Sequence, residues 1–271
     1  MEDIKIIFED RDILVLHKPA GVIVNRSDTT KEEKTVQDWV EGYLKIHDLK
    51  SQIPNKSKIS NSNGKDSLGF SPSADGLDLE FLDRAGIVHR LDKETSGILI
   101  VAKTSGSFEN LQSQFKERKV KKTYIALVHG KVDSSQGEIN APLGRLPWNR
   151  KRFGVIAGGR EAITKYKILN IKYKIADREK EPLTLLELYP ETGRTHQIRV
   201  HLRYINHPVF ADPLYAGRKT ARNDRMFLPR VFLHASKISL SHPKTGQLIS
   251  FEAKLPKELS DFVSRLSTLN N

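Results

Sequence analysis

The sequence contains no cysteine among its 271 residues, which excludes disulfide bonds, cysteine-bound zinc, iron–sulfur clusters and thiol nucleophiles. Long hydrophobic runs are also missing, because the longest apolar stretches, such as 97–102, are far shorter than the roughly 20 residues that cross a bilayer. The first residues include two acidic side chains and no basic region followed by an apolar stretch, so we expect no signal peptide. These absences predict a soluble, globular protein of the cytoplasm.

Positive charge is what the sequence has in excess. Lys and Arg together number 45 against 33 Asp and Glu, which gives a formal net charge of +12 at pH 7. Such an excess favours a polyanionic partner, but many basic proteins have none, so net charge alone leaves nucleic-acid binding at even odds. Hydrophobic residues make up 38% of the chain, which is enough for a core. At this length we expect one large domain or two closely fused lobes.

Short alternating apolar segments separated by turns predict that strands outnumber helices. Strands are expected over 4–8, 13–16, 22–24, 98–101, 123–128, 161–168, 184–189, around Ile238, and over 248–253. Helices are expected with Thr30 and Ser107 as caps, from Thr195 onward, and after Pro256. Because the strands arrive mostly in neighbouring pairs, we predict an α+β fold with a mixed, largely antiparallel sheet and helices on its flanks.

A polar loop, HRLDKETSG at 89–97, lies between two apolar strand segments. It brings four charged groups and two hydroxyls together, and loops held by rigid strands are common places for reactive groups. On these residues alone Asp92 is equally a turn former, and Thr95 or Ser96 a cap. The spacing Gly-x-x-x-x-Gly-Lys of a phosphate-binding loop is absent here.

A second cluster, GRTHQIRVH at 193–201, is basic. On a helix, His196, Arg199 and Arg203 share one face while apolar residues fill another, which gives either a functional cationic face or a solvated helix side. Zinc binding is a poor interpretation, because His196 and His201 are five residues apart and the His-Glu-x-x-His motif is missing.

Together the two motifs, GIVHRLDKETSG at 86–97 and GRTHQIRVH at 193–201, resemble the signature pair of the RluA-type family of RNA pseudouridine synthases. The likeness runs from about residue 6 to residue 256 and implies that family's catalytic fold, with an RNA cleft across its middle, as a single catalytic domain over 1–271. Shorter segments agree in order, namely KPAG at 18–21, KTYIA at 122–126, DPLY at 212–215 and LHA at 233–235.

RNA binding outside the motifs depends on two further features. Many members of the family begin with a small RNA-binding domain of the S4 type, for which we expect no room in this sequence. Ser, Asn, Lys and Gly dominate 51–75, so we expect a flexible insertion within the domain there. RNA binding would then depend on the catalytic domain and on this segment.

The resemblance implies an enzyme that converts uridine in RNA to pseudouridine without a cofactor or a metal. The N1–C1′ bond breaks, the uracil rotates, and a new bond forms through C5. Charge develops at the anomeric carbon, so a carboxylate near C1′ is the natural stabiliser or nucleophile, as in glycosidases. Asp92 matches the family's catalytic aspartate. Whether it attacks the sugar, attacks the base or removes a proton from C2′ stays open.

The resemblance also implies roles for other residues. Arg199 matches the residue that pairs with the catalytic aspartate and would keep it ionised. Tyr124 matches the tyrosine that stacks on the uracil, and it is a candidate for removing the C5 proton, with packing in the core as its alternative. Arg90 matches an arginine that fills the space of the flipped nucleotide. Further RNA contacts are expected from Lys116, Arg118, Lys119, Lys121, Lys122, Arg194 and His196.

We expect ribosomal RNA of the large subunit as substrate, with transfer RNA as the alternative. A non-catalytic RNA-binding protein on the same fold is a second hypothesis, and the presence of Asp92, Tyr124 and Arg199 together argues against it. A third is a metal-independent glycosidase or nucleosidase built on Asp92 and Glu94, which needs the two carboxylates roughly 5 to 9 Å apart. No membrane, metal or cofactor is expected, and we predict a monomer.

Overall fold

The computed structural model describes residues 4–26, 33–46, 79–174 and 182–268. The insertion predicted at 51–75 and the cap predicted at Thr30 lie outside these residues. The strands are β1 (Lys5–Glu9), β2 (Ile13–Lys18), β3 (Ser96–Ala102), β4 (Lys121–His129), β5 (Gln136–Asn140), β6 (Leu143–Leu146), β7 (Asn149–Val155), β8 (Ile163–Lys174), β9 (Leu183–Pro190), β10 (Leu233–Ser241), β11 (Leu248–Glu252) and β12 (Ser267–Thr268). The helices are α1 (Val36–Tyr43), α3 (Leu79–Asp83), α4 (Ser105–Lys116), α5 (Gln197–Tyr204), α6 (Arg218–Asp224) and α7 (Lys257–Ser264). Among these helices none is long and apolar enough to cross a membrane.

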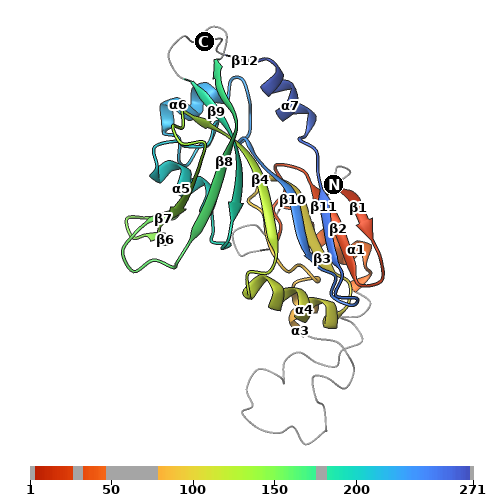
Figure 1. The fold of residues 1–271 in the computed structure, drawn as a ribbon. Helices are drawn as coiled ribbons and strands as arrows, with labels where there is room; N and C mark the ends of the chain where they lie inside the picture. Colours follow the sequence, from red (N-terminus) through yellow and green to blue (C-terminus); the bar gives the residue numbers. More distant parts are fainter. Residues whose placement is uncertain (1–3, 27–32, 47–78, 175–181, 269–271) are drawn as a thin grey trace, which may run out of the picture.

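One ten-stranded sheet organises the molecule (Figure 1). Its strand order is β1-β2-β3-β10-β4-β9-β8-β12, with β11 beside β10 and β5 beside β8. The pairs in the described residues are antiparallel except β3 with β10, which run parallel where Ser96 and Gly97 face His234 and Ala235. The strands β6 and β7 form a separate hairpin next to α5 (Figure 1). The predicted α+β fold with a mixed, largely antiparallel sheet is confirmed.

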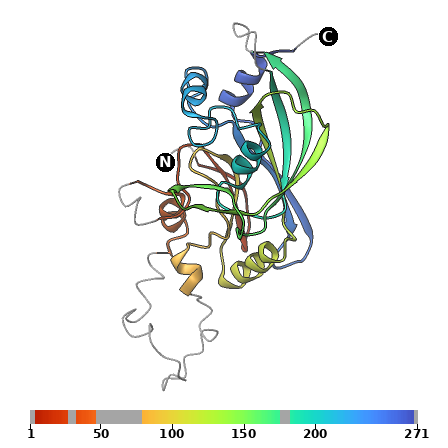
Figure 2. The same ribbon diagram turned by 90° about the vertical axis from the view of Figure 1, so that its left-hand side faces the viewer.

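The strands β4 and β9 are buried on both faces, since apolar clusters cover each side of the sheet there. Successive side chains of a strand point to opposite sides, so neighbouring residues enter different clusters. Ile125 of β4 packs in one cluster with Phe262 of α7, whereas the next residue, Ala126, packs in another with Leu202 of α5. A third cluster joins β1, β2 and β3 to α1, α3 and α4. Figure 2 shows α4 at one end of the sheet and α6 and α7 at the other. The sheet therefore gives α5, which carries the second motif, a rigid backing.

The strand predicted at 22–24 does not form. The carbonyl of Ile23 accepts a hydrogen bond from the amide of Val36 at 2.8 Å, and the carbonyl of Val24 accepts one from Gln37 at 2.9 Å. These amides are among the first N–H groups of α1, which have no partner within the helix. The apolar residues at 22–24 are thus used to close a helix end rather than to extend the sheet.

Two helix caps lie at other residues than predicted. Thr35 caps α1, with its hydroxyl accepting from the amide of Asp38 at 3.2 Å and the carboxylate of Asp38 accepting from the amide of Thr35 at 2.6 Å. This is a capping box, which satisfies two end groups reciprocally. Thr104 caps α4 by accepting from the amide of Ser107 at 3.2 Å, so Ser107 lies inside the helix.

The helix predicted from Thr195 begins at Gln197 instead. The residue before it, His196, adopts a left-handed backbone conformation with φ 56°, which turns the chain sharply into the helix. The shared cationic face predicted for His196, Arg199 and Arg203 is wrong, because Arg199 is buried while Arg203 is exposed. The strands β5, β6 and β7 and the helix α6 were not predicted, because their residues show no clear period of two or 3.6.

Candidate active site

The loop that carries Asp92 is held in place by hydrogen bonds from the end of β2 and the turn after it. The carbonyl of Lys93 accepts hydrogen bonds from the amide of Gly21 at 2.8 Å and from the ammonium of Lys18 at 3.1 Å. Within the loop the amide of Thr95 donates to the carbonyl of Asp92 at 3.1 Å. The chain then enters β3, which is completely buried. The side chain of Asp92 stays 21% exposed, so it is held by a rigid support and remains accessible.

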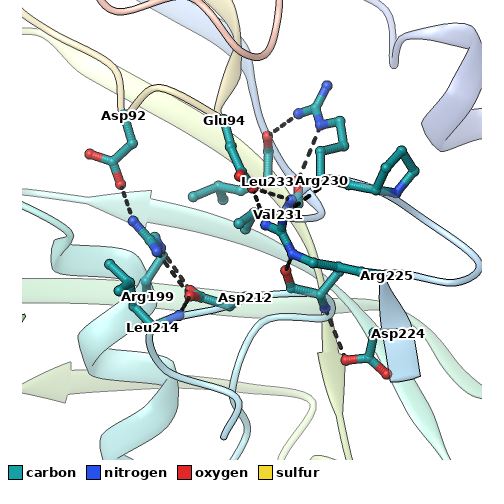
Figure 3. A network of polar contacts seen from close by, with 12 residues as sticks. Asp92, Glu94, Arg199, Asp212, Leu214, Asp224, Arg225, Arg230, Val231 and Leu233 are labelled. Carbon is teal, nitrogen blue, oxygen red and sulfur yellow. Dashed lines mark hydrogen bonds and ion pairs between the residues drawn. The ribbon is translucent and has the colours of Figure 1, made fainter. Parts of the chain in front are cut away.

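Arg199 connects Asp92 to a second carboxylate, Asp212 (Figure 3). Its Nη1 donates to Oδ2 of Asp92 at 3.0 Å, while Nε and Nη2 donate to the two oxygens of Asp212 at 2.7 and 2.9 Å. Asp212 is 0% exposed, and one of its oxygens also accepts from the amides of Leu214 and Tyr215 at 2.9 and 3.1 Å. Asp212 therefore fixes the guanidinium in the orientation that places Nη1 against Asp92.

The charge of Arg199 is secured by its two carboxylate partners. Burial alone would lower the pKa of Arg199, but the hydrogen bonds and charges of Asp212 and Asp92 together raise it above its ordinary value. The guanidinium carbon also lies 5.1 Å from the centre of the Tyr215 ring, in a cation–π contact. A permanent cation is thus held beside the Asp92 carboxylate.

A cavity of about 600 Å³ brings the two sequence motifs together. Of the charged side chains around it, seven are Lys or Arg and two are acidic, which makes it strongly cationic. It is lined by Asn25, Arg84, Val88, His89, Arg90, Leu91, Asp92, Thr95, Phe115, Lys116, Arg118, Lys122, Tyr124, Pro190, Glu191, Thr192, Gly193, Arg194, Thr195, His196, Gln197, Ile198, Arg199 and Leu233. The catalytic residues suggested by the sequence, Asp92, Tyr124 and Arg199, therefore all border one space.

Tyr124 reaches the cavity from β4 and also packs against the apolar clusters on either side of it. Burial raises the pKa of Tyr124 well above its ordinary value, and the negative charge of Asp92 raises it further. The phenol consequently keeps its proton at neutral pH. Tyr124 thus offers the cavity a flat apolar ring and a hydroxyl that can donate a hydrogen bond.

His196 borders the cavity at the start of α5 and is tied to Tyr215. Its Nδ1 lies 2.9 Å from the Tyr215 hydroxyl, which also accepts from the amide of Phe153 at 3.1 Å. Burial lowers the pKa of His196, an effect that Asp92 opposes. His196 is therefore a neutral hydrogen-bonding group at neutral pH rather than a phosphate-binding cation.

The other basic residues suggested by the sequence differ in their placement. Lys119 and Lys121 do not line the cavity, and Lys119 pairs with Glu117 at 2.6 Å. Arg118 lines the cavity but its two terminal nitrogens bind the carboxylate of Glu161 at 3.1 and 3.0 Å. The remaining lining cations from the prediction are Arg90, Lys116, Lys122 and Arg194.

Lys122 is a lining cation whose pKa burial lowers. Its ammonium donates to the carbonyl of Thr192 at 3.2 Å, and burial lowers its pKa to about 8. The pKa of Lys122 therefore lies close to neutral pH. Arg90 and Lys116, by contrast, are exposed to solvent.

Sequence reasoning missed two residues that support the site, Asp212 and Lys18. Both belong to short segments that carried the resemblance, DPLY and KPAG, but no period or charge pattern marked them as buried. Lys18 is 0% exposed, and its ammonium donates to the carbonyls of Pro19, Val22 and Lys93 at 2.8, 2.8 and 3.1 Å. Burial, together with the charge of Arg230, lowers the pKa of Lys18 to about 7, while Asp92 acts in the opposite direction.

Glu94 does not act as a second carboxylate for Asp92. Its Oε2 accepts hydrogen bonds from Arg225 and from the amide of Val231 at 3.0 Å, which ties the loop to the segment before β10 (Figure 3). The carboxylate that shares a partner with Asp92 is Asp212, and Arg199 lies between the two. Glu94 is thus engaged in holding the loop, which argues against its use as the second acid of a glycosidase.

One group of possible metal ligands exists among the described residues, formed by Asp10, Asp12 and His242. Their side chains are already engaged in hydrogen bonds. Nδ1 of His242 accepts from the amides of Lys244 and Thr245 at 3.2 and 3.1 Å, so Nε2 carries the proton that it donates to Asp10 at 2.8 Å. The group therefore pins two turns together, and it contains no residue that lines the cavity.

Comparisons with known proteins agree with this geometry. The family model described as RNA pseudouridylate synthase matches residues 12–204. Ribosomal large subunit pseudouridine synthase D of Nitrosomonas europaea is 36% identical over 270 residues, which cover 98% of this chain and 66% of that protein. The uncharacterized RNA pseudouridine synthase YlyB of Bacillus subtilis is 33% identical over 264 residues, covering 97% of this chain and 73% of that protein. The solved structure of Human RNA Pseudouridylate Synthase Domain Containing 1 has a TM-score of 0.67 and 25% identity, over 98% of this chain and 89% of that one.

Proposed function

Because the chain belongs to the RNA pseudouridylate synthase family, we propose that it isomerises uridines to pseudouridine in ribosomal RNA of the large subunit. The observation that carries this proposal is the Asp92 carboxylate, held by Arg199 at 3.0 Å in a cavity rich in cations. The name of the Nitrosomonas relative supports ribosomal RNA as the substrate class. Transfer RNA is the alternative substrate that the same assay would detect.

Asp92 is the group that acts on the sugar or the base. As the N1–C1′ bond breaks, positive charge develops at C1′, and an ionised carboxylate stabilises that charge or bonds to the carbon. Arg199 holds one oxygen of Asp92 by a hydrogen bond, and the fully buried Asp212 keeps Arg199 in place. Since Arg199 uses Nη1 for Asp92 and its other donors for Asp212, the Asp92 oxygen that does not bind Arg199 remains available to the substrate.

Tyr124 packs against the uracil while the base is detached from the sugar. An aromatic face holds a base by stacking but leaves it free to turn in its own plane, which the rejoining through C5 requires. Because its pKa is raised, Tyr124 must first lose its own proton before it can take the proton from C5. Stacking is therefore its first role, and proton removal depends on an acceptor that becomes available during the reaction.

Exposed cations at the edge of the cavity bind the RNA strand. Arg90 and Lys116 are exposed at the cavity, and phosphate contacts of such residues give affinity without reading sequence. Arg90 is two residues from Asp92, which suits an arginine that occupies the place left by the flipped uridine. The cavity volume of about 600 Å³ lies within the range of small-ligand pockets, large enough for one nucleotide.

The test is release of tritium from C5 of labelled uridine in a transcript of large-subunit ribosomal RNA, with a transfer RNA transcript in parallel. We expect release from the ribosomal transcript, unchanged by a chelator, and none with Asp92→Asn. Arg11→Ala, an exposed change in the turn between β1 and β2, serves as the control that keeps full activity. If neither transcript releases tritium while both bind, the proposal of catalysis is wrong and the non-catalytic hypothesis replaces it.

A further inference from the structure

A second cavity, of about 330 Å³, lies next to the one that contains Asp92. The two share Gly193, Arg194 and Thr195 as a common wall, and the hairpin of β6 and β7 with the turn after it supplies the rest. Neither Asp92 nor Tyr124 borders this second space. Its volume is that of a small-ligand site, so it can hold one group of a bound strand.

Positive charge dominates the second cavity. Arg145, Arg160 and Arg194 line it, and among the described residues that line it none is acidic. The guanidinium carbon of Arg145 lies 5.1 Å from the centre of the Phe153 ring, which orients it by a cation–π contact. Nε of Arg194 donates to the backbone carbonyl of Glu161 at 3.1 Å, a contact that positions the side chain. The Glu161 carboxylate, whose pKa the charge of Arg194 helps to lower, is bound by Arg118 and does not line the cavity.

The backbone around this cavity is preformed. Arg160 and Leu143 exchange two hydrogen bonds, each 2.8 Å long, in an isolated bridge. A Cβ atom on Gly159 would lie 2.8 Å from the carbonyl carbon of Leu143, so only glycine permits this close approach. The main chain that carries Arg160 is therefore fixed against β6 before any ligand arrives, which reduces the ordering cost of binding.

We propose that this second cavity is a subsite for the phosphodiester group of a nucleotide adjacent to the target uridine. The inference rests on the proposed function, since it needs an RNA strand with one base in the first cavity. A strand that places a base there and crosses the shared wall at Arg194 brings a neighbouring phosphate to a cavity lined by three guanidinium groups. The planar, permanently charged guanidinium matches the geometry of phosphate oxygens.

The first experiment measures binding without turnover. An oligouridylate of about eight nucleotides is titrated by fluorescence anisotropy between about 50 and 200 mM salt. For Arg145→Ala and Arg160→Ala we expect the affinity to fall roughly three- to tenfold and the salt slope to shrink by about 0.7 each, the value for one phosphate contact on a single strand. Circular dichroism melting checks that both variants stay folded.

Arg11→Ala is the matched control, because it removes the same charge from an exposed arginine between β1 and β2. Figure 1 shows these two strands on the opposite side of the molecule from the hairpin of β6 and β7. Arg11→Ala should leave the salt slope unchanged. If Arg145→Ala and Arg160→Ala behave like Arg11→Ala, or if the oligouridylate does not bind the wild-type protein, the subsite is refuted. If both substitutions reduce the salt slope of binding but the wild-type protein converts no uridine, the subsite is supported and the proposed function is refuted.

The second experiment locates the phosphate. In a stem-loop around the uridine that the wild-type protein converts, each linkage near the target is replaced in turn by a neutral methylphosphonate. We expect one linkage adjacent to the target to weaken binding by the wild-type protein but not to weaken binding by Arg160→Ala further, as a double-mutant cycle requires for interacting groups. Independent, multiplying losses at every linkage would contradict the assignment.

Discussion

At the scale of single residues, the site depends on one guanidinium shared between two carboxylates of different burial. Asp212 is fully buried, whereas the Asp92 side chain is 21% exposed. The buried carboxylate fixes Arg199, and the accessible one is free to meet substrate. From the sequence alone, Asp92 is the carboxylate expected to lose its counter-charge when Arg199 is removed, but the deeper burial of Asp212 assigns that penalty to Asp212.

Arg199→Met should therefore lower the free energy of unfolding by about 3–5 kcal/mol, because Asp212 would keep a buried charge without its partner. Adding Asp212→Asn should restore part of the loss, since the amide oxygen can still accept from the amides of Leu214 and Tyr215. Adding Asp92→Asn should restore little. Urea unfolding of the single and double variants decides between them, and a rescue by Asp92→Asn alone would reverse the assignment.

Tyr124→Phe tests the two roles of this residue. The ring remains, so we expect RNA affinity to stay close to that of the wild-type protein. If the hydroxyl transfers a proton, turnover should fall by about 100-fold or more. Single-turnover rates and binding constants measured on the same RNA check this, and equal losses in both would instead indicate that Tyr124 is a packing residue.

Lys18 gives the protein a pH-dependent stability whose sign follows from its pKa. Burial lowers that pKa to about 7, so between pH 7 and the ordinary value of a lysine the unfolded chain binds a proton that the folded chain lacks. Raising the pH through this window favours the folded state, by at most about 1.4 kcal/mol per pH unit. Relative to Lys18→Met, the wild-type protein should thus gain stability from pH 7 to 9 in urea unfolding. A flat difference would mean that the three carbonyls keep the ammonium charged.

Some of these residues were accessible from the sequence and others were not. Asp92, Tyr124 and Arg199 lie in motifs whose likeness to a family indicates a role, and the structure places all three around one cavity. The buried state of Lys18 is not encoded locally, because a lysine before a proline normally reads as an exposed turn residue. Its burial follows from the loop at Lys93, 75 positions away, whose carbonyl it binds.

At the scale of elements, the periodicity of apolar residues located the long helices and strands. The predicted cap residues and helix starts were wrong by a few positions. The capping box of Thr35 and Asp38 is visible in the sequence as a threonine followed three residues later by an acid. The pairing of β3 with β10 was not visible, because the partners Ser96 and His234 are 138 residues apart. Such a register is set by packing across the whole sheet and leaves no signal in either segment.

Gly97 is the element-level position where a small change should have a large effect. It follows the loop that carries Asp92 and has φ +122°. A Cβ atom there would lie 2.2 Å from the carbonyl oxygen of Ala235 on β10. Gly97→Ala should therefore force β3 and β10 apart, lower the melting temperature strongly and abolish turnover. Gly106→Ala is the control within α4, where a Cβ meets nothing within 4 Å, so it should stabilise the protein by about 0.5–1 kcal/mol. Equal melting temperatures for the two variants would contradict this argument.

At the scale of the whole molecule, the sheet positions the residues of the site, and the charge distribution favours an anionic substrate. The sheet brings a loop before β3, the strand β4 and the helix α5 to one cavity, although these segments are far apart in the sequence. Charge concentrates at the same place, with seven Lys or Arg against two acidic residues around the cavity, in a chain of net charge +12. The fold therefore places Asp92, the carboxylate proposed for catalysis, among many cations.

This arrangement predicts that Asp92→Asn separates chemistry from binding. Affinity for RNA is dominated by many phosphate contacts, each of which releases counterions, and the loss of one negative charge among many cations changes that sum little. We expect turnover below about 1% of the wild-type rate, because the group acting at the reacting centre is gone. The affinity should change less than about tenfold, and the slope of affinity against salt should stay the same. Tritium release and anisotropy on one RNA provide both readouts. A variant that keeps turnover would refute the role of Asp92, whereas one that loses binding and turnover together would show that the carboxylate organises the RNA-binding surface through Arg199.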